Sequence, residues 1–300
     1  MERKIGFIGL GAMGKPMASN LLRKGYSLTA FDLRSEPLQE LAKMGASIAK
    51  SSKETAEKAE VVITMLVSSP HVEAALLGRE GVIEGIRTGS LVIDMSTIAP
   101  AATRKVGMEL MKKGVEMLDA PVARGVKAAV EGTLAIFVGG KKDVFERNRD
   151  ILETMGTDVS YVGSLGCGEV VKLVNQLILS VTVATIAEGM VLGVKGGVDP
   201  EVLFEVLGKG SANSFALQNH FKNFVMKGDF SEAVFPVEYI LKDLGLILET
   251  GKELQVPLLL SGITTQLYEF ARASGMDRNY FPVVIQVLEK LTGVEVRKNR

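Results

Sequence analysis

The chain has 300 residues and a mass of 32.2 kDa, which is longer than one ordinary domain, so its length predicts two domains. Hydrophobic residues make up 47% of the chain and charged residues 23%, which is typical of a folded globular protein and excludes bulk disorder. The 35 basic and 35 acidic residues cancel, which argues against a nucleic-acid-binding protein.

Few residues are available for disulfides or metal ligation. Cys167 is the single cysteine and has no partner for an intrachain disulfide, so we expect a cytoplasmic protein. His71 and His220 lie far apart in the sequence, and no metal site is predicted. The longest apolar run lies between Lys172 and Glu188 and is shorter than the roughly 20 residues that span a bilayer. We therefore expect a buried helix there and no membrane contact.

The first half of the chain alternates between strand and helix patterns. The expected strands are short and apolar on both faces: Lys4–Ile8, Ser27–Phe31, Val61–Leu66, Leu91–Met95, Glu116–Leu118 and Leu134–Val138. The helices expected between them are Lys15–Lys24, Pro37–Met44, Lys53–Ala59, Ala101–Lys113 and Asp143–Met155. Strands of this kind belong to parallel sheets covered on both sides, so the pattern predicts a doubly wound α/β domain.

After about residue 163 the strand pattern stops. The expected helices are Glu169–Lys195, Pro200–Gly208, Phe215–Met226, Val237–Glu253, Ser261–Ala273 and Tyr280–Leu291. The glycine-rich segment Tyr161–Gly168 is interpreted as the joint between the domains. The sequence thus predicts an α/β domain over residues 1–163 and an all-helical domain over residues 164–300, and its apolar helices favour a homo-oligomer, a dimer or a tetramer.

A glycine motif follows the first strand. Gly9, Gly11 and Gly14 form G-x-G-x-x-G between a strand and a helix, which is the context that a dinucleotide-binding loop requires. Gly9 allows the turn, Gly11 lets the backbone reach a pyrophosphate, and Gly14 lets the helix pack closely on the strand. The predicted cofactor contacts in this loop are Gly9, Leu10, Gly11, Ala12, Met13 and Gly14.

Asp32 follows the second strand, where a carboxylate can accept hydrogen bonds from both ribose hydroxyls. It favours NAD because it would repel the 2′-phosphate of NADP, whereas Arg34 and Ser35 leave NADP open. The segment from Gly9 to Lys15 also begins a nucleoside-triphosphate loop, but Pro16 stands where Ser or Thr would ligate Mg²⁺.

Four blocks of the sequence, in order, resemble the β-hydroxyacid dehydrogenases. They are GFIGLGAMGKPMASNL (Gly6–Leu21), DAPVARGVKAAVEGTL (Asp119–Leu134), GCGEVVKLVNQ (Gly166–Gln176) and KDLGL (Lys242–Leu246). The resemblance covers essentially the whole chain. It implies a Rossmann domain, a long interdomain helix, a helical C-terminal domain, and hydride transfer between a nicotinamide cofactor and a short 3-hydroxy acid or its semialdehyde.

The resemblance also implies residue roles. Lys172 matches the lysine that exchanges the proton, a role that desolvation and the charge of oxidised nicotinamide would favour near neutral pH. Asn175 matches the amide that orients this lysine and bonds the substrate, although Gln176 is a rival for that role. Lys242 matches a lysine that reaches the cofactor from the helical domain.

Strand ends supply the remaining expected cofactor contacts. Leu66, Val67 and Thr97 follow strands at the edge where open α/β sheets bind ligands. An alternative for Ser96 and Thr97 is capping of the helix after Pro100.

The expected substrate loop is Ala123, Arg124 and Gly125, which departs from the family's Ser-Gly-Gly. The guanidinium of Arg124 suits a carboxylate or a sulfonate. It favours a strongly anionic substrate, as in the sulfolactaldehyde reductases, unless Arg124 instead pairs with a surface carboxylate. The partner expected for the whole chain is thus a small anionic hydroxy acid or semialdehyde.

Three other functions deserve comparison. A 6-phosphogluconate dehydrogenase would need a larger helical domain, and an imine reductase usually carries another residue at the position of Lys172. A non-catalytic dinucleotide sensor would not need Lys172 and Asn175.

Overall fold

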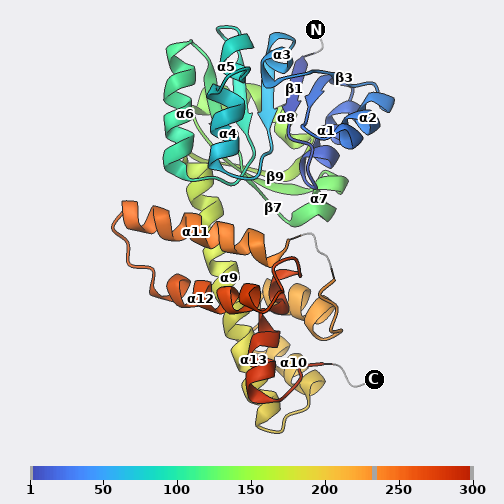
Figure 1. Cartoon of the computed structure of the whole chain (residues 1–300), viewed down its shortest axis with the longest axis vertical. Coiled ribbons are helices and arrows are strands. Elements are labelled where there is room, and N and C mark those ends of the chain that lie inside the picture. The colour runs from blue at the N-terminus through green and yellow to red at the C-terminus, as the bar shows by residue number, and fades with distance from the viewer. Residues whose placement is uncertain (1–2, 232–234, 298–300) are drawn as a thin grey trace. The chain divides into compact units, whose positions relative to one another are not determined.

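A computed structural model of the chain describes residues 3–231 and 235–297 (Figure 1). The chain divides into two compact units, Met1–Lys172 and Leu173–Arg300. This division falls later than the predicted one between residues 163 and 164, because the first turn of a long helix bonds to the first unit.

The first unit is built on a mostly parallel sheet with the strand order β3-β2-β1-β4-β5-β6-β8-β7, and β9 pairs with β8. The strands are β1 (Lys4–Ile8), β2 (Ser27–Phe31), β3 (Ser47–Ile48), β4 (Val61–Thr64), β5 (Leu91–Asp94), β6 (Glu116–Asp119), β7 (Val122–Ala123), β8 (Leu134–Gly139) and β9 (Gly156–Gly163). The order reverses direction between β1 and β4, which is the position where open α/β sheets bind ligands.

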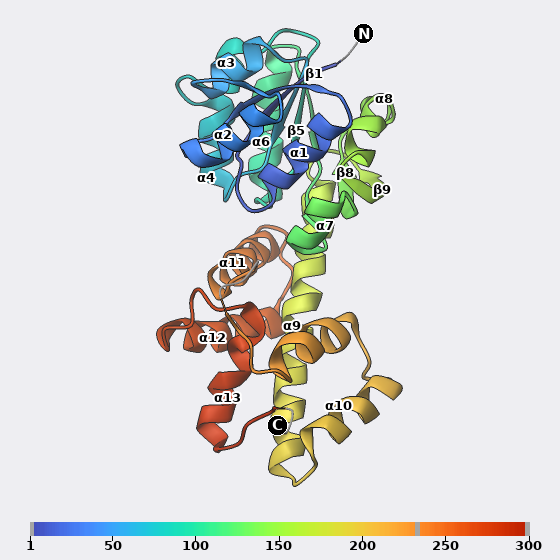
Figure 2. The same cartoon turned by 90° about the vertical axis from the view of Figure 1, so that its right-hand side faces the viewer.

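Helices cover both faces of this sheet (Figures 1 and 2). They are α1 (Gly14–Arg23), α2 (Ser35–Lys43), α3 (Ser52–Glu57), α4 (Ser69–Leu77), α5 (Val82–Gly85), α6 (Pro100–Lys112), α7 (Gly125–Glu131) and α8 (Lys142–Glu153). Within β4, Val61 and Ile63 belong to one buried cluster, and Val62 belongs to the cluster on the other face. The predicted doubly wound α/β domain is therefore confirmed, because alternate side chains of one strand enter two separate cores.

Six elements of the first unit were not predicted from the sequence: β3, β7, β9, α4, α5 and α7. The sheet is also not wholly parallel, since β8 runs antiparallel to β6 and β7. The longest of the strands that were not predicted is β9, which has eight residues and whose last residues, Tyr161 to Gly163, were expected to belong to the joint. Its residues are mostly half-buried or exposed, so it lacks the continuous apolar run that marks the central strands.

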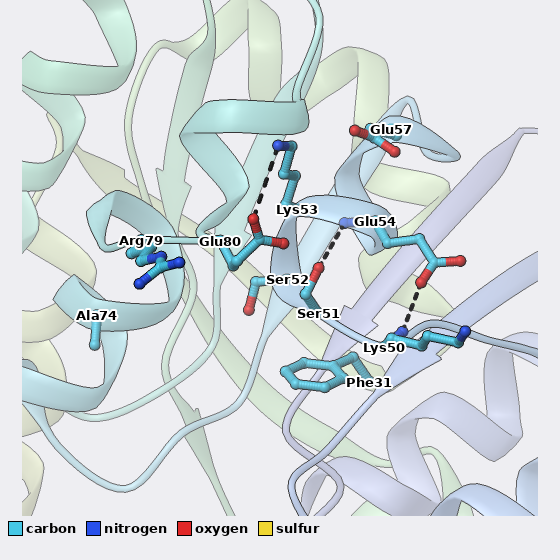
Figure 3. Close-up of a pocket in the computed structure, with 10 residues that line it drawn as sticks. All are labelled: Phe31, Lys50, Ser51, Ser52, Lys53, Glu54, Glu57, Ala74, Arg79 and Glu80. Atoms are coloured by element: carbon cyan, nitrogen blue, oxygen red, sulfur yellow. Dashed lines mark hydrogen bonds and ion pairs between the residues drawn. The ribbon is translucent and has the colours of Figure 1, made fainter.

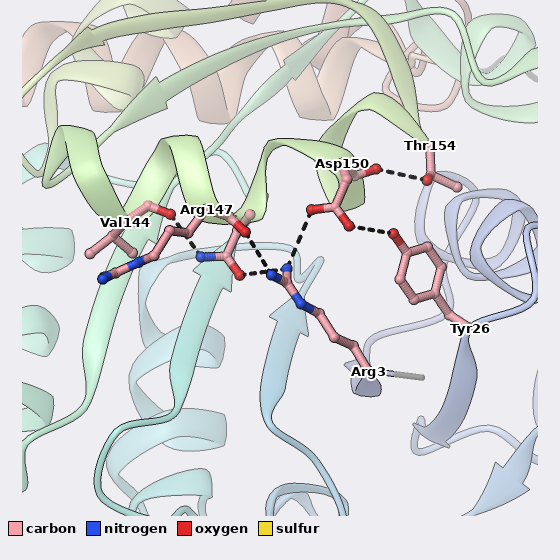
Figure 4. Close-up of polar contacts among 7 residues, drawn as sticks. Arg3, Tyr26, Val144, Arg147, Asp150 and Thr154 are labelled. Atoms are coloured by element: carbon pink, nitrogen blue, oxygen red, sulfur yellow. Dashed lines mark hydrogen bonds and ion pairs between the residues drawn. The ribbon is translucent and has the colours of Figure 1, made fainter. Parts of the chain in front are cut away.

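Side chains from α8, from the residue before β1 and from the turn before β2 meet in the first unit (Figure 4). The guanidinium of Arg3 donates to the carbonyl oxygen of Arg147 at 2.7 Å and pairs with Asp150 at 3.3 Å. The Tyr26 hydroxyl donates to the other oxygen of Asp150 at 3.0 Å. Burial first, and then the Asp150 carboxylate, raises the pKa of Tyr26. These contacts join α8 to the starts of β1 and β2, which are the strand ends opposite to the predicted phosphate and ribose contacts.

The second unit is all-helical, as predicted. Its elements are most of α9 (Cys167–Lys195), then α10 (Pro200–Lys209), the π-helix η1 (Ala216–Val225), α11 (Val237–Glu253), α12 (Leu259–Ala273), the 3-10 helix η2 (Phe281–Val284) and α13 (Ile285–Thr292). Two expected α-helices differ in type: 215–226 forms a π-helix, and 280–291 begins as a 3-10 helix. One buried cluster, with Phe221, Leu244 and Tyr268 among its members, forms the core.

Helix α9 has 29 residues, and it is the one helix among residues 3–231 and 235–297 that length and composition would allow to cross a membrane. It extends well beyond the charge-free run after Lys172, so the argument that this segment is too short for a bilayer is wrong. Core helices of soluble proteins also pass this test when they are mostly buried. Val183, Ala187 and Met190 of α9 are buried in the second unit, and 33% of its apolar window is buried in all.

We expect His220 to make the stability of the second unit depend on pH. Burial among aromatic rings lowers the pKa of His220 to about 4, and its Nδ1 lies 2.8 Å from the Tyr280 hydroxyl. Between pH 6.5 and pH 4 the unfolded chain binds a proton that the folded chain does not. The free energy of unfolding should therefore decrease as the pH falls from 6.5 to 4, by about 3 kcal/mol in total for this group.

We expect His220→Gln to remove this part of the pH dependence. The measurement is the free energy of urea unfolding at pH 7 and pH 4.5, followed by circular dichroism, for the wild type and the variant. His71→Gln is the control, because His71 is exposed. If the wild type and His220→Gln lose equal stability between the two pH values, the assignment is wrong.

Candidate active site

The glycine loop between β1 and α1 has the geometry of a phosphate site. A Cβ atom on Gly14 would overlap the carbonyl oxygen of Gly9, whereas one on Gly11 would meet no atom within 4 Å. Helix α1 is preceded by Met13, whose side chain makes no capping hydrogen bond. The N–H of Lys15 is bonded to the Gly11 carbonyl oxygen at 3.1 Å and that of Met17 to the Met13 carbonyl oxygen at 3.3 Å. The support for a ligand here is therefore the helix dipole, which favours an anion, and the open space beside Gly11. The loop fits the pyrophosphate of a dinucleotide.

Asp32 supports this loop, and its side chain is 10% exposed. Its Oδ2 accepts the backbone N–H of Leu10 at 2.6 Å, and Arg34 donates to its Oδ1 from the backbone at 2.9 Å and from Nε at 3.1 Å. Burial alone would raise the pKa of Asp32, but the hydrogen bonds from Arg34 and Leu10 hold it below its usual range. Asp32 is therefore charged at neutral pH, as repulsion of a 2′-phosphate requires.

The loops that follow β4 and β5 are joined through a buried carboxylate. Asp94 Oδ1 accepts hydrogen bonds from the hydroxyls of Thr64 at 2.8 Å and Ser96 at 2.6 Å. The hydroxyl of Ser96 accepts the backbone N–H of Leu66 at 2.9 Å. Burial raises the pKa of Asp94 against the effect of these hydrogen bonds. The predicted contacts Leu66 and Thr97 thus flank one rigid network.

At this edge of the sheet, Ser96 and Val67 differ from what the sequence suggested. Helix α6 is preceded by Ala99, which makes no side-chain cap, so Ser96 supports the β4 loop and does not cap a helix. Val67, expected at the end of a strand, lies beyond β4 and is 55% exposed.

The expected substrate loop follows β6, and Arg124 within it has an unusual backbone. Its φ is +87°, a region that favours glycine. Its guanidinium pairs with the Asp158 carboxylate at 2.5 Å and donates to the carbonyl oxygen of Thr133 at 3.1 Å. Arg124 thus pairs with a surface carboxylate on β9, which is the alternative that the sequence left open.

Lys172 lies in the second turn of α9 and is 7% exposed. The start of this helix is held by Asp119, whose two oxygens accept the backbone N–H groups of Gly166 at 2.7 Å and Glu169 at 2.9 Å. Asp119 ends β6, at the same edge of the sheet as the phosphate loop. The fold therefore brings Lys172 to the edge that carries the expected cofactor contacts.

Further along α9, the second unit contains a chain of polar contacts. Asn175 donates to the Gln176 Oε1 at 3.0 Å, and Gln176 donates to the Asp243 Oδ2 at 2.7 Å. Lys242 forms an ion pair with the other Asp243 oxygen at 3.0 Å. Gln176 is 3% exposed, whereas Asn175 is exposed. This arrangement favours Asn175 as the amide that meets a substrate and Gln176 as its support.

A cavity of about 570 Å³ lies between α3 and the α4–α5 segment (Figure 3). Phe31, the residue before Asp32, lines it together with Lys50, Lys53, Glu54 and Glu80. The acidic side chains balance the basic ones, and none of the predicted site residues lines the cavity. The cavity adjoins the candidate active site at Phe31.

Sequence reasoning missed the buried carboxylates Asp119, Glu169 and Asp243. Each lies inside a block that carries the family resemblance, and Asp119 and Asp243 begin or nearly begin theirs. An acid inside an otherwise apolar block was the signal that could have identified them, because a carboxylate is buried only where it is bonded.

Comparisons with known proteins agree with this geometry. Residues 4–163 match the NAD binding domain of 6-phosphogluconate dehydrogenase, and residues 166–288 match the family described as NAD-binding of NADP-dependent 3-hydroxyisobutyrate dehydrogenase. The chain is 42% identical to 2-(hydroxymethyl)glutarate dehydrogenase of Eubacterium barkeri, over 98% of this chain and 97% of that protein. It is 36% identical to the NAD-dependent L-serine dehydrogenase of Pseudomonas aeruginosa, over 97% and 99%.

The fold matches a solved structure of the same kind. The 3-hydroxyisobutyrate dehydrogenase of Mycobacterium tuberculosis, solved with L-serine, has a TM-score of 0.88 and 31% identity, over 96% of this chain and 99% of that one. Two consecutive family matches and relatives that align end to end agree with the phosphate loop and the lysine-bearing helix. The chain therefore belongs to the β-hydroxyacid dehydrogenase family and is an NAD(P)-dependent enzyme that acts on a CH–OH group.

Proposed function

We propose that this enzyme interconverts a short 3-hydroxy acid and its semialdehyde, with Lys172 as the general acid and base. The observation that carries the proposal is the position of Lys172. It is a nearly buried lysine on a helix whose start is bonded to Asp119, at the edge of the sheet that bears the phosphate loop. A buried amine at this edge suits proton exchange with a substrate oxygen.

Each group has one role in the proposed reaction. The nicotinamide, when bound, accepts a hydride from the carbinol carbon or donates one to the carbonyl carbon. Lys172 Nζ takes the hydroxyl proton in oxidation and returns a proton to the oxygen in reduction. Asn175 bonds the substrate and orients Lys172, while Gln176 holds Asn175 through the contact at 3.0 Å. The loop Gly9–Gly14 and Asp32 hold the dinucleotide, and the charge of Asp32 favours NAD over NADP.

The function is tested by measuring NADH formation with a panel of 3-hydroxy acids and NADH consumption with their semialdehydes. The panel should include 3-hydroxyisobutyrate, serine and 2-(hydroxymethyl)glutarate, the compounds in the names of the relatives. We expect saturable turnover with at least one of them. NADH binding without turnover of any substrate would instead favour a dinucleotide sensor.

The substrate is proposed to carry a second anionic group, a carboxylate or a sulfonate. The support is Arg124 in the substrate loop, together with the relative whose name contains a glutarate. Arg124 is paired with Asp158 in the structure, and their side chains are 46% and 58% exposed. An exposed pair of this kind contributes at most about 1 kcal/mol, so a substrate anion can replace Asp158 as the partner of Arg124.

Replacing Arg124 by Ala should raise KM for the best anionic substrate by about tenfold to a thousandfold, with a smaller change in kcat. The reason is that a desolvated ionic contact carries about 2–5 kcal/mol when one partner is truncated. Steady-state kinetics give both constants. Lys127→Ala is the control, because this lysine of α7 has an 88% exposed side chain. An unchanged KM, or equal turnover of uncharged alcohols, would show that Arg124 serves only Asp158.

We also propose a homo-oligomer, a dimer or a tetramer, formed through the second unit. Support comes from large apolar side chains exposed on it: Ile178 and Leu192 of α9, and Leu259, Ile263 and Phe270 of α12 are 59% to 78% exposed. Light scattering on the purified protein should give at least twice 32.2 kDa, and a monomer at micromolar concentration would contradict this.

A cytoplasmic location stays part of the proposal and rests on the single cysteine.

A further inference from the structure

One buried carboxylate connects the substrate loop to the helix that carries Lys172. Asp119 is the last residue of β6, is fully buried, and stands four residues before Ala123. Its Oδ1 accepts the N–H of Gly166 at 2.7 Å, and its Oδ2 accepts the N–H of Glu169 at 2.9 Å. Helix α9 is thus capped by a residue about fifty positions earlier in the chain, where a negative charge also complements the helix dipole.

The surroundings of this carboxylate leave it little freedom. A Cβ atom on Gly139 would overlap Asp119 Oδ1, and one on Gly168 would lie 2.8 Å from Oδ2. Real side-chain carbons do not approach oxygen so closely. Two glycines therefore allow β8 and α9 to close around Asp119, and the carboxylate cannot shift without moving one of them.

The same turn of α9 is bonded to the loop of the expected cofactor contact Thr97. Glu169, also fully buried, accepts the backbone N–H of Ile98 through Oε2 at 3.2 Å. Lys172 follows three residues after Glu169, so the two lie on one side of the helix, one turn apart. The first turn of α9 is therefore held from the substrate loop and from the cofactor loop at once.

We propose that Asp119 is a positioning residue for Lys172. By fixing the first turn of α9 to the end of β6, it sets the distance between the Lys172 amine and the substrate loop Ala123–Gly125. It touches neither substrate nor cofactor. The inference rests on the proposed role of Lys172 as the acid and base. A displacement of about 1 Å at a reacting group can cost about a hundredfold in rate, so this anchor should affect turnover strongly.

The test is a double-mutant cycle with Asp119→Asn and Lys172→Ala. Asparagine keeps the size of the side chain. However, it has one acceptor oxygen for the two N–H groups of Gly166 and Glu169, and its own NH₂ group would lie against one of them. With Lys172 present, Asp119→Asn should lower kcat about tenfold to a hundredfold while NADH binding, followed by fluorescence, stays near the wild type. In the Lys172→Ala background, the same change should alter the residual kcat less than about threefold.

Glu289→Gln provides the matched control. Glu289 is a buried carboxylate of the second unit that accepts the backbone N–H of Val296 at 2.7 Å. Its loss should lower the melting temperature and leave kcat unchanged. Gly139→Ala is the second variant for Asp119, and it removes no hydrogen-bonding group. Its Cβ would overlap Asp119 Oδ1 and would also press on the backbone of Ser164 and Gly168 at the start of α9, which is the turn that Asp119 holds. It should lower kcat in the same way.

Equal loss of kcat in both Lys172 backgrounds would overturn the proposal, since it would show that Asp119 does not act through Lys172. Failure of both Asp119→Asn and Gly139→Ala to fold would also overturn it, by assigning Asp119 to the fold alone. These outcomes differ from a failure of the proposed function. That function fails earlier, if the wild type turns over no hydroxy acid or if Lys172→Ala is fully active.

Discussion

Lys172→Ala should lower kcat by roughly 10²–10⁴ and leave NADH binding nearly intact, because a positioned acid or base contributes that much to a proton transfer. Oxidation of an alcohol by hydride loss must also release the hydroxyl proton. Lys172 is 7% exposed, so little water reaches this position. Water should therefore be a poor substitute for Lys172 as the group that exchanges the proton. The measurement combines steady-state rates with NADH fluorescence on the same preparation.

Lys195→Ala is the control for Lys172→Ala. It removes a lysine from the other end of α9, where Nζ donates to the carbonyl oxygen of Thr292 at 2.7 Å. It should leave kcat unchanged. A Lys172→Ala variant that keeps more than half of the wild-type kcat would refute the assignment of the acid and base.

Asp32→Ala should weaken NAD binding by about tenfold to a hundredfold and raise the NADP/NAD ratio of kcat/KM. Hydrogen bonds to a charged group contribute about 1.5–3 kcal/mol, and removal of the carboxylate also removes the repulsion of a 2′-phosphate. The structure adds a second reason. Asp32 accepts the N–H of Leu10 at 2.6 Å, so its loss also loosens the phosphate loop.

Asp32→Asn separates these two contributions. The amide oxygen can still accept the N–H of Leu10, but the negative charge is gone. The variant should therefore keep most of its NAD affinity while it gains activity with NADP. A wild type that already prefers NADP tenfold or more would show that Arg34 and Ser35 decide the choice of cofactor.

The central strands could be predicted because each is buried on both faces. The predicted strands Lys4–Ile8 and Ser27–Phe31 agree with β1 and β2 residue for residue. By contrast, Thr157 and Asp158 place polar side chains in β9, and an edge strand of this kind has no continuous apolar run to reveal it. The π-helical hydrogen bonding of η1 was equally hidden, since an apolar pattern does not distinguish it from an α-helix.

In the candidate site, too, some features could be predicted from the sequence and others could not. Glycine spacing identified the phosphate loop, because Gly9 and Gly14 stand where a Cβ atom would overlap backbone atoms, while the space beside Gly11 is open. The partner of Arg124 was not predictable, since Asp158 lies on the unpredicted strand β9. The support of Lys172 by Asp119 was hidden for another reason: the two residues are 53 positions apart, and only folding brings β6 to the start of α9.

The anchoring of α9 by Asp119 bears on how related enzymes can exchange halves during evolution. A crossover in the glycine-rich segment Tyr161–Gly168 would join the Asp119 of one parent to the first helical turn of another. A crossover just after Lys172 would keep the carboxylate, its two backbone donors and the lysine in one inherited piece. Productive recombinants in this family should therefore break inside the helix, after the lysine, more often than in the glycine-rich segment before it.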